Sequence, residues 1–429
     1  MSLAATLVAA VLAASGCVGT ASGTPAGPAA SVAPAAAGAS AVPGTSPDPG
    51  SDASAAADTA AALDALLAQR EHAVLAGDPE AFAATVADLA SPAGVRQLAA
   101  FRSAHDLRPV LLSHDAVPPV EDPDGGVVVR LRYRIDRVDR ADRATEVRYR
   151  LARTAAGWRV AAEEATDGGG AAPWLAMPGM RVERGQHAVV AGTADDAALA
   201  EAVATVDAVL PGLARQWDGT PDHVLVLVPD TPEQTDALLG RGSRPVGDVA
   251  ATTEGPLDAD GLATGDRVVL DPDARARLRT VGREVVLAHE LAHVAVRATV
   301  PGSAPGWLSE GYADHVGYDR ADVPATELAA PLLRAVRGGT APTELPTAEE
   351  LDPTTHDIEV GYLASWQAVE TVADRHGEAR LRALVRACVT PDGEAAAEQR
   401  CDRAMPDVLG EDRAEVTRAW RQRLASLAG

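Results

Sequence analysis

The chain contains no lysine, so all 38 of its basic side chains are arginines, and they are outnumbered by 61 aspartates and glutamates. The formal net charge of −23 argues against nucleic-acid binding, because few cationic groups are left over to neutralise phosphates. Aromatic residues make up only 3% of the sequence, so alanine, valine and leucine must fill the hydrophobic cores. The length of 429 residues and the hydrophobic content of 47% still allow two or three such cores.

Cysteine is also rare, and the first of three cysteines, Cys17, follows an apolar run over residues 3–14. That run has the length of a signal-peptide core and is too short to span a bilayer. Ala14-Ser15-Gly16-Cys17 resembles the lipobox of bacterial lipoproteins, although leucine is preferred at the position of Ala14 and no basic residue precedes the run. We predict a signal peptide over 1–17 with lipidation of Cys17; an ordinary secretory signal is the alternative.

Residues 18–57 consist almost wholly of alanine, glycine, serine, threonine and proline. Such a composition cannot bury enough apolar surface to offset the entropy of ordering the chain. We therefore predict a flexible tether that holds the folded part of the protein away from a membrane.

The other two cysteines, Cys388 and Cys401, are separated by the polar segment VTPDGEAAAEQR. In an oxidising compartment outside the cytoplasm, this spacing can close as a disulfide hairpin. Two unrelated buried thiols are the alternative.

The segment from residue 58 to residue 166 changes from helical to strand-like patterning. Apolar residues first recur at helical spacing, with a break at Gly77-Asp78-Pro79, and three later stretches alternate apolar and charged residues. This order, with AVLAGDPEAF at the break, resembles the cone-shaped α+β fold of the nuclear transport factor-like superfamily. The segment shows no cluster of catalytic side chains, so we expect it to serve docking or stabilisation. Its histidines, His72, His105 and His114, receive no role.

Residues 167–180 begin with the glycine-rich DGGGAAPW and are interpreted as a linker. From residue 181 onward, short apolar strands alternate with amphipathic helices, one of which has Thr231 as its N-cap. The proline- and glycine-punctuated stretch Pro324 to Pro346 is interpreted as a loop.

An HExxH motif lies in the apolar segment VVLAHELAHVAVRA at residues 285–298. A helix over residues 281–297 places His289 and His293 on one face, where both rings can bind one metal ion. Glu290 lies beside them, and its carboxylate can take a proton from a metal-bound water, as in a zinc hydrolase. The alternative is a chance pattern on an alanine- and valine-rich core helix.

A second acidic segment, WLSEGYADH at residues 307–315, follows one loop later. The intervening ATVPGSAPG favours a turn that brings a second helix alongside the first. Glu310 is then the best candidate for the third zinc ligand. Asp314, one helical turn further along, is placed to accept the free ring N–H of a zinc-bound histidine and to fix its orientation.

Together the two segments resemble the gluzincin metallopeptidases, in which the HExxH helix precedes a helix with a glutamate ligand in a W-L-x-E-G-x-A setting. The residues that match this setting are Trp307, Leu308, Glu310, Gly311 and Ala313. The resemblance is to small bacterial "peptidase MA-like" domains and covers most of residues 181–390.

This resemblance implies roles for three further positions. Arg267 to Leu270 would be the edge strand along which an extended peptide pairs its backbone, with an ordinary core strand as the alternative. Tyr362 matches a tyrosine that faces the metal and stabilises the oxyanion of the tetrahedral intermediate; a core tyrosine is the alternative. His356 is a second candidate for that task.

We therefore predict an α+β protein with a signal peptide (1–17), a tether (18–57), a cone-shaped domain of helices and antiparallel sheet (58–166), a linker (167–180) and a gluzincin peptidase-like domain (181–429) with a small sheet lobe and a mainly helical lobe. The expected function is extracytoplasmic hydrolysis of a peptide or protein substrate, with one zinc ion on His289, His293 and Glu310 and with Glu290 as general base. The alternatives are an inactive, zinc-stabilised scaffold lipoprotein and a metal-free adhesin or solute-binding lipoprotein.

Overall fold

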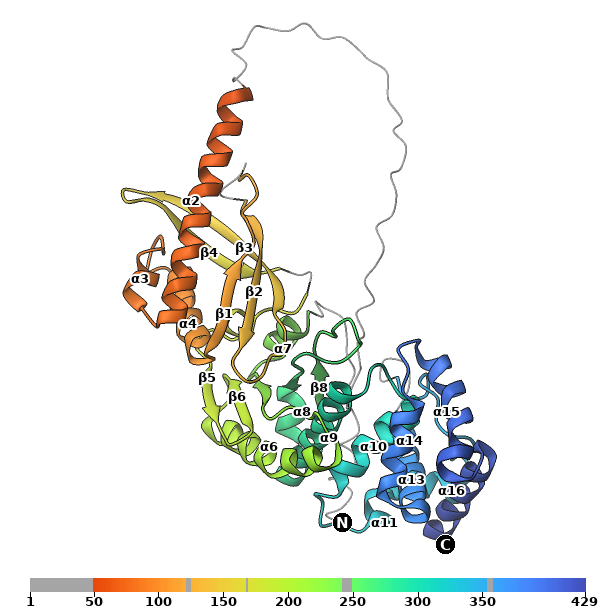
Figure 1. The fold of residues 1–429 in the computed structure, drawn as a ribbon. Helices are drawn as coiled ribbons and strands as arrows, with labels where there is room; N and C mark the ends of the chain where they lie inside the picture. The colour runs from red at the N-terminus through yellow and green to blue at the C-terminus, as the bar shows by residue number, and fades with distance from the viewer. Residues whose placement is uncertain (1–48, 121–124, 167–168, 241–248, 353–357) are drawn as a thin grey trace, which may run out of the picture.

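The computed structural model describes residues 49–120, 125–166, 169–240, 249–352 and 358–429, so Cys17 and His356 lie outside the described residues. The chain forms an N-terminal unit of helices and antiparallel sheet, then a five-stranded sheet, then a helical C-terminal region (Figure 1). The mixed α+β class predicted from the sequence is confirmed.

The N-terminal unit packs its helices against one face of a four-stranded antiparallel sheet, whose strands are neighbours in chain order. Along β2, buried residues alternate with more exposed ones, as expected for a sheet with one wet face. Leu63 and Phe101 from the helices share a hydrophobic cluster with Leu131 from the sheet. The elements are α2 (Pro49–Ala76), α3 (Pro79–Ala83), α4 (Pro92–Asp106), β1 (Pro109–His114), β2 (Val127–Ile135), β3 (Arg143–Thr154) and β4 (Gly157–Ala165).

Helix α2 begins at Pro49, inside the segment that we predicted to be a flexible tether. The prediction is therefore wrong for residues 49–57. Alanine is common in low-complexity segments, but it also has the highest helix propensity of all residues, and the amphipathic stretch that follows continues the helix.

The second sheet has the strand order β5-β6-β7-β9-β8, with β6, β7 and β9 parallel and an antiparallel strand at each edge. Helix α6 has the length and apolar composition of a membrane span, and its Leu199, Val206 and Leu213 pack in the core of this region. The elements are α5 (Pro173–Ala176), β5 (Arg181–Arg184), β6 (Ala188–Gly192), α6 (Asp196–Gln216), β7 (Val224–Val228), α7 (Pro232–Leu239), β8 (Ala251–Glu254), β9 (Arg267–Leu270) and α8 (Pro272–Arg277).

The predicted linker over residues 167–180 is wrong for its second half, which is part of the core. Trp174, Met177 and Met180 are buried in a cluster that also contains residues of the N-terminal unit and of the second sheet. Only the start of this segment is rich in glycine. The large apolar side chains that follow are buried, and their burial joins the two units.

The C-terminal region is helical throughout its regular structure. The stretch 324–346 was interpreted as a loop, which is wrong for residues 325–338, where two short helices, α11 and α12, lie; residues 339–346 contain no helix or strand. Helix α13 ends at His376 and α14 begins at Glu378, so Gly377 separates the two helices. The elements are α9 (Thr280–Thr299), α10 (Gly306–Tyr318), α11 (Ala325–Leu328), α12 (Ala330–Gly338), α13 (Glu359–His376), α14 (Glu378–Cys388), α15 (Glu394–Leu409) and α16 (Arg413–Ala428).

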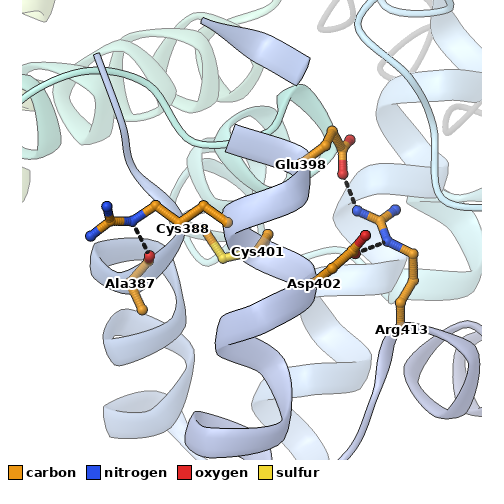
Figure 2. The surroundings of a disulfide bond; sticks show 7 residues. Ala387, Cys388, Glu398, Cys401, Asp402 and Arg413 are labelled. Carbon is orange, nitrogen blue, oxygen red and sulfur yellow. Dashed lines mark hydrogen bonds and ion pairs between the residues drawn. A yellow bond between two sulfur atoms is a disulfide. The ribbon is translucent and has the colours of Figure 1, made fainter. Parts of the chain in front are cut away.

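A disulfide with an S–S distance of 2.06 Å joins Cys388, at the end of α14, to Cys401 on α15 (Figure 2). Helix α15 begins at Glu394, so the segment between the cysteines is partly helical rather than a polar loop. Beside the disulfide, Arg413 pairs with Glu398 and Asp402, which attaches the start of α16 to α15 (Figure 2). The disulfide and these ion pairs together fix the last three helices to one another.

Candidate metal centre

Helix α9 carries the HExxH motif and is buried along most of its length. Its run of alanine, valine and leucine favours burial on several faces, which explains why it lies between the sheet and the other helices. His289 and His293 project from one face, and their Nε2 atoms are 3.1 Å apart. The sequence spacing therefore brings two imidazole nitrogens to one point.

Helix α10 approaches α9 closely because glycines stand at its contact points. A Cβ added to Gly317 would lie 2.9 Å from the carbonyl oxygen of Val285 on α9. Where α10 packs against α13, a Cβ added to Gly311 would lie 2.4 Å from the carbonyl oxygen of Ser365. Any larger residue would push the helices apart. The glycines thus hold α10 against both α9 and α13.

This packing places Glu310 opposite the two histidines. Its Oε2 lies 3.4 Å from Nε2 of His289 and 3.5 Å from Nε2 of His293. All three side chains are buried, and their ligand atoms lie within 4.8 Å of one another. Oε2 of Glu310 is buried without a hydrogen-bond partner among the described residues, which is costly unless another group satisfies it. A donor set of two imidazoles and one carboxylate fits a catalytic zinc ion.

Asp314 orients one of the two imidazoles. Its Oδ1 lies 2.8 Å from Nδ1 of His289, so the ring N–H belongs on Nδ1 and the lone pair of Nε2 points toward Glu310 and His293. The other oxygen, Oδ2, is buried and has no hydrogen bond among the described residues. The Asp314 carboxylate therefore fixes which nitrogen of His289 is available to a metal.

The charges of the site depend on one another. Burial alone would lower the pKa of His289, but its hydrogen bond to Asp314 and the nearby carboxylate of Glu310 raise that pKa to about 10. Burial opposes ionisation of Glu310, yet the two histidines lower its pKa to about 2. Burial raises the pKa of Asp314 despite its bond to His289. A cation is strongly favoured at the centre of this group, whether it is a proton or a metal ion.

Glu290 is fully buried, and Thr253 on β8 donates a 2.6 Å hydrogen bond to its Oε2.

The strand order of the second sheet corrects the prediction for the edge strand. Residues Arg267–Leu270 form β9, which pairs with β7 on one side and with β8 on the other and is therefore interior. The edge strand next to α9 is β8, Ala251–Glu254, which precedes β9 in the chain but lies outside it in the sheet.

Tyr362 lies on α13, the helix packed against α10, and its side chain is buried in the hydrophobic cluster around the site. The structure brings the side chains of His289, His293, Glu310 and Asp314 together. Glu290 follows His289 on α9, with its carboxylate bonded to Thr253, and Tyr362 lies on a neighbouring helix.

Two nearby side chains were missed by sequence reasoning. Thr253 carries no signal in the sequence, because its bond to Glu290 depends on how the sheet packs on α9. Tyr318, one turn after Asp314, has a buried hydroxyl without a hydrogen-bond partner among the described residues. Burial and the negative charge of Asp314 raise its pKa well above the usual value. Its position four residues after Asp314 is the signal that could have identified it.

The N-terminal unit also contains a polar cluster that we did not predict. His114 contacts Glu71 through Nδ1 and the hydroxyl of Tyr149 through Nε2, both at 2.7 Å. The same Tyr149 hydroxyl donates to Glu163, which pairs with the buried Arg70. These partners come from different helices and strands, so no local sequence pattern predicts that they meet. Because each member is hydrogen-bonded, the cluster is suited to specifying the packing of this unit.

No protein-family model and no curated protein sequence matches the chain. Among solved structures, it is similar to a mutant of an M1 zinc metallopeptidase from Deinococcus radiodurans, with 17% sequence identity and a TM-score of 0.32 over 56% of this chain. The chain matches 51% of the length of that protein. A structural similarity this remote does not support a functional assignment. The function proposed below rests on the geometry of the site.

Proposed function

We propose that this protein is a zinc metallopeptidase of the gluzincin type. The observation that carries the proposal is the convergence of two histidine Nε2 atoms on a buried oxygen of Glu310 that has no hydrogen-bond partner among the described residues, with the carboxylate of Glu290 on the helix of the two histidines. A chance pattern on a core helix would not explain a buried carboxylate on a second helix facing both rings.

His289, His293 and Glu310 would hold the zinc ion, which when bound supplies Lewis-acid chemistry by acidifying water and polarising the scissile carbonyl. Glu290 takes a proton from the attacking water and passes it to the amide nitrogen of the leaving peptide. Thr253 fixes the orientation of the Glu290 carboxylate, and Asp314 fixes that of His289. Tyr362 is the proposed donor to the oxyanion.

We further propose that β8 is the strand along which an extended peptide substrate lies. It is the edge strand on the side of α9, and its Thr253 contacts the proposed general base. Among the described strands, β8 pairs with β9 alone, whereas the interior β9 has a neighbour on both sides, and a strand at the edge of a sheet is the one that a peptide backbone can extend.

We propose an extracytoplasmic location with a lipid anchor on Cys17. The bond between Cys388 and Cys401 supports it, because disulfides persist in oxidising compartments. The N-terminal unit, with helices before an antiparallel meander, is proposed to be a nuclear transport factor-like domain that serves stabilisation or docking. Replacement of Cys17 by alanine tests the anchor: we expect the protein to move from the membrane fraction to the soluble fraction.

The proposed activity is tested by digestion of an unfolded protein with the purified full chain. Glu290→Gln should abolish hydrolysis while the zinc content stays at one ion per chain, and a chelator should abolish it in the wild type. Glu284→Gln is the matched control, because it makes the same change on the same helix at a half-buried position.

Two outcomes would contradict the proposal and favour the alternatives. Stoichiometric zinc without hydrolysis of any peptide in a diverse library would indicate a zinc-stabilised scaffold. Purified protein without stoichiometric metal would indicate a metal-free binding protein.

A further inference from the structure

A cavity of about 170 Å³ lies where the N-terminal unit meets the second sheet. This volume is more than about ten times the 10–15 Å³ that one water needs. Its charged and titratable wall residues come from four segments of the chain: Arg108 after α4, Asp136 and Arg137 between β2 and β3, Arg184 at the end of β5, and His223 before β7. None of them belongs to the metal centre.

The two arginines from the N-terminal unit have unusual backbone conformations. Among the residues that the structure describes, only Arg108 and Arg137 have a positive φ without being glycine, at 57° and 61°. Arg108 follows the end of a helix, and Arg137 occupies a tight turn in which the N–H of Asp139 bonds the carbonyl of Ile135. Glycine is the favourable residue at both kinds of position.

Both strained positions therefore carry a long cationic side chain where glycine would be easier, and both side chains line the same cavity. The N–H of Asp136 donates to the carbonyl of Arg108, so the two turns are also bonded to each other. Strained backbone conformations of this kind cluster at active sites and at sites that hold ligands.

Neighbouring cationic groups of the wall repel one another. Burial and the charge of Arg108 lower the pKa of Arg184, and burial and the charge of Arg137 lower the pKa of His223. Within the part of the chain that the structure describes, the buried Nδ1 of His223 has no hydrogen-bond partner, and no hydrogen bond or ion pair involves the guanidinium of Arg108. Arg108, Arg137 and Arg184 are themselves exposed, so their like charges surround an open pocket and make it complementary to an anion.

Carboxylates only partly balance these charges. Asp136 is the acidic residue in the wall, and its ion pair with Arg137 is exposed and 3.9 Å long. Asp106 and Asp222 also attract Arg184 and His223, respectively. With His223 neutral, the wall itself carries two net positive charges in a chain whose net charge is −23. The overall charge disfavours a nucleic acid, whereas this wall is matched to a small dianion.

We propose that this cavity binds a phosphoryl group, either as inorganic phosphate or as the head of a small phosphate ester. Guanidinium groups suit this ligand because their forked N–H donors match the oxygens of a phosphate, which carries close to two negative charges at neutral pH. The site is independent of the proposed peptidase activity.

The test is calorimetric titration of the full chain with inorganic phosphate, before and after chelation of metal. We expect one site that survives chelation, because phosphate held at the metal centre would be lost. Arg108→Gly and Arg137→Gly should each weaken binding about ten- to a hundredfold, the range for losing a charged hydrogen bond. Their melting temperatures should stay equal or rise, because glycine relieves the positive φ.

Arg418→Ala, at an exposed position on α16, controls for the loss of one charge and should bind phosphate like the wild type. Glycerol 3-phosphate distinguishes the sources: tighter binding than phosphate indicates an ester, and weaker binding indicates the free ion. The proposal is overturned if phosphate does not bind, if both glycine variants bind it unchanged, if acetate competes equally well, or if the glycine variants lose stability together with binding.

Discussion

The hydroxyl of Thr253 donates a 2.6 Å hydrogen bond to Oε2 of Glu290, so the edge strand of the second sheet holds the carboxylate of the HExxH motif. The hydroxyl also lies 3.3 Å from the backbone carbonyl of Glu290, which places it directly against α9. The orientation of the proposed general base is therefore set by a residue that lies 37 positions away in the chain.

Thr253→Val removes this hydrogen bond with little change in shape. We expect kcat to fall by about ten- to a hundredfold, the range for a hydrogen bond to a charged group, while zinc content stays constant. Thr253→Ser should restore most of the activity because it keeps the hydroxyl. Steady-state kinetics on one peptide substrate measures the effect; a rise in KM with kcat unchanged would show that Thr253 acts on substrate binding instead.

Asp314→Asn should weaken zinc binding about ten- to a hundredfold, because the carboxylate that orients His289 is replaced by a neutral amide. Competition with a chromophoric chelator measures the affinity directly. Asp319→Asn, at the exposed end of the same helix, is the matched control. Equal zinc affinity in the Asp314 and Asp319 variants would exclude the orienting role.

Gly311→Ala should lower the free energy of unfolding by about 1–3 kcal/mol, the usual cost of overpacking. The added Cβ would meet the carbonyl of Ser365 at 2.4 Å, so α10 must move away from α13 and carry Glu310 with it. Gly338→Ala is the control, because its Cβ meets only the Thr340 hydroxyl, at 3.8 Å. Denaturant unfolding of both variants checks this prediction, which fails if the two variants are equally stable.

Arg267→Met should cost about 3–5 kcal/mol, because it leaves the buried carboxylate of Asp139 without its cation. The two side chains are 2% and 0% exposed and form a bidentate pair that joins the N-terminal unit to β9. Adding Asp139→Leu should recover much of the lost free energy of unfolding, because it removes the buried carboxylate that has no cation. A double-mutant cycle in denaturant gives the coupling, and a double variant less stable than Arg267→Met would contradict this account.

His315 should make stability depend on pH. Its Nδ1 and Nε2 contact Glu370 and Glu378 at 2.7 and 3.0 Å, and only the protonated ring can donate from both nitrogens. Burial lowers the pKa of His315, but the two carboxylates raise it above the ordinary 6.5. Burial opposes ionisation of Glu370, yet His315 lowers the pKa of that carboxyl below 4.5.

The stabilisation from His315 is fully present below pH 6.5 and is lost as pH rises through its raised pKa. The stabilisation from Glu370 is present above pH 4.5 and is lost as pH falls through its lowered pKa. His315→Gln should therefore cost most between these values, up to about 1.5–3 kcal/mol, and less in alkaline solution. Urea unfolding across pH checks this, and a cost independent of pH would refute it.

The sequence alone determined the local features of this protein. The four-residue spacing of His289 and His293 fixes their common face on any helix, and the helix starting near Trp307 follows from the turn residues before it. The break at His376 and Gly377 is equally local, because glycine there adopts a φ of 83°. Each of these features depends on residues within one or two helical turns, so residue spacing and turn chemistry are enough to predict it.

Only the tertiary structure decided which segments meet. Strand β9 inserts between β7 and β8, which makes β8 the edge strand and brings Thr253 to Glu290. The same kind of distant packing brings Arg108 and Arg137 to one cavity. The sequence pattern records which face of an element is buried, but not which other element buries it, because strand order and domain contacts are set by packing across the whole chain.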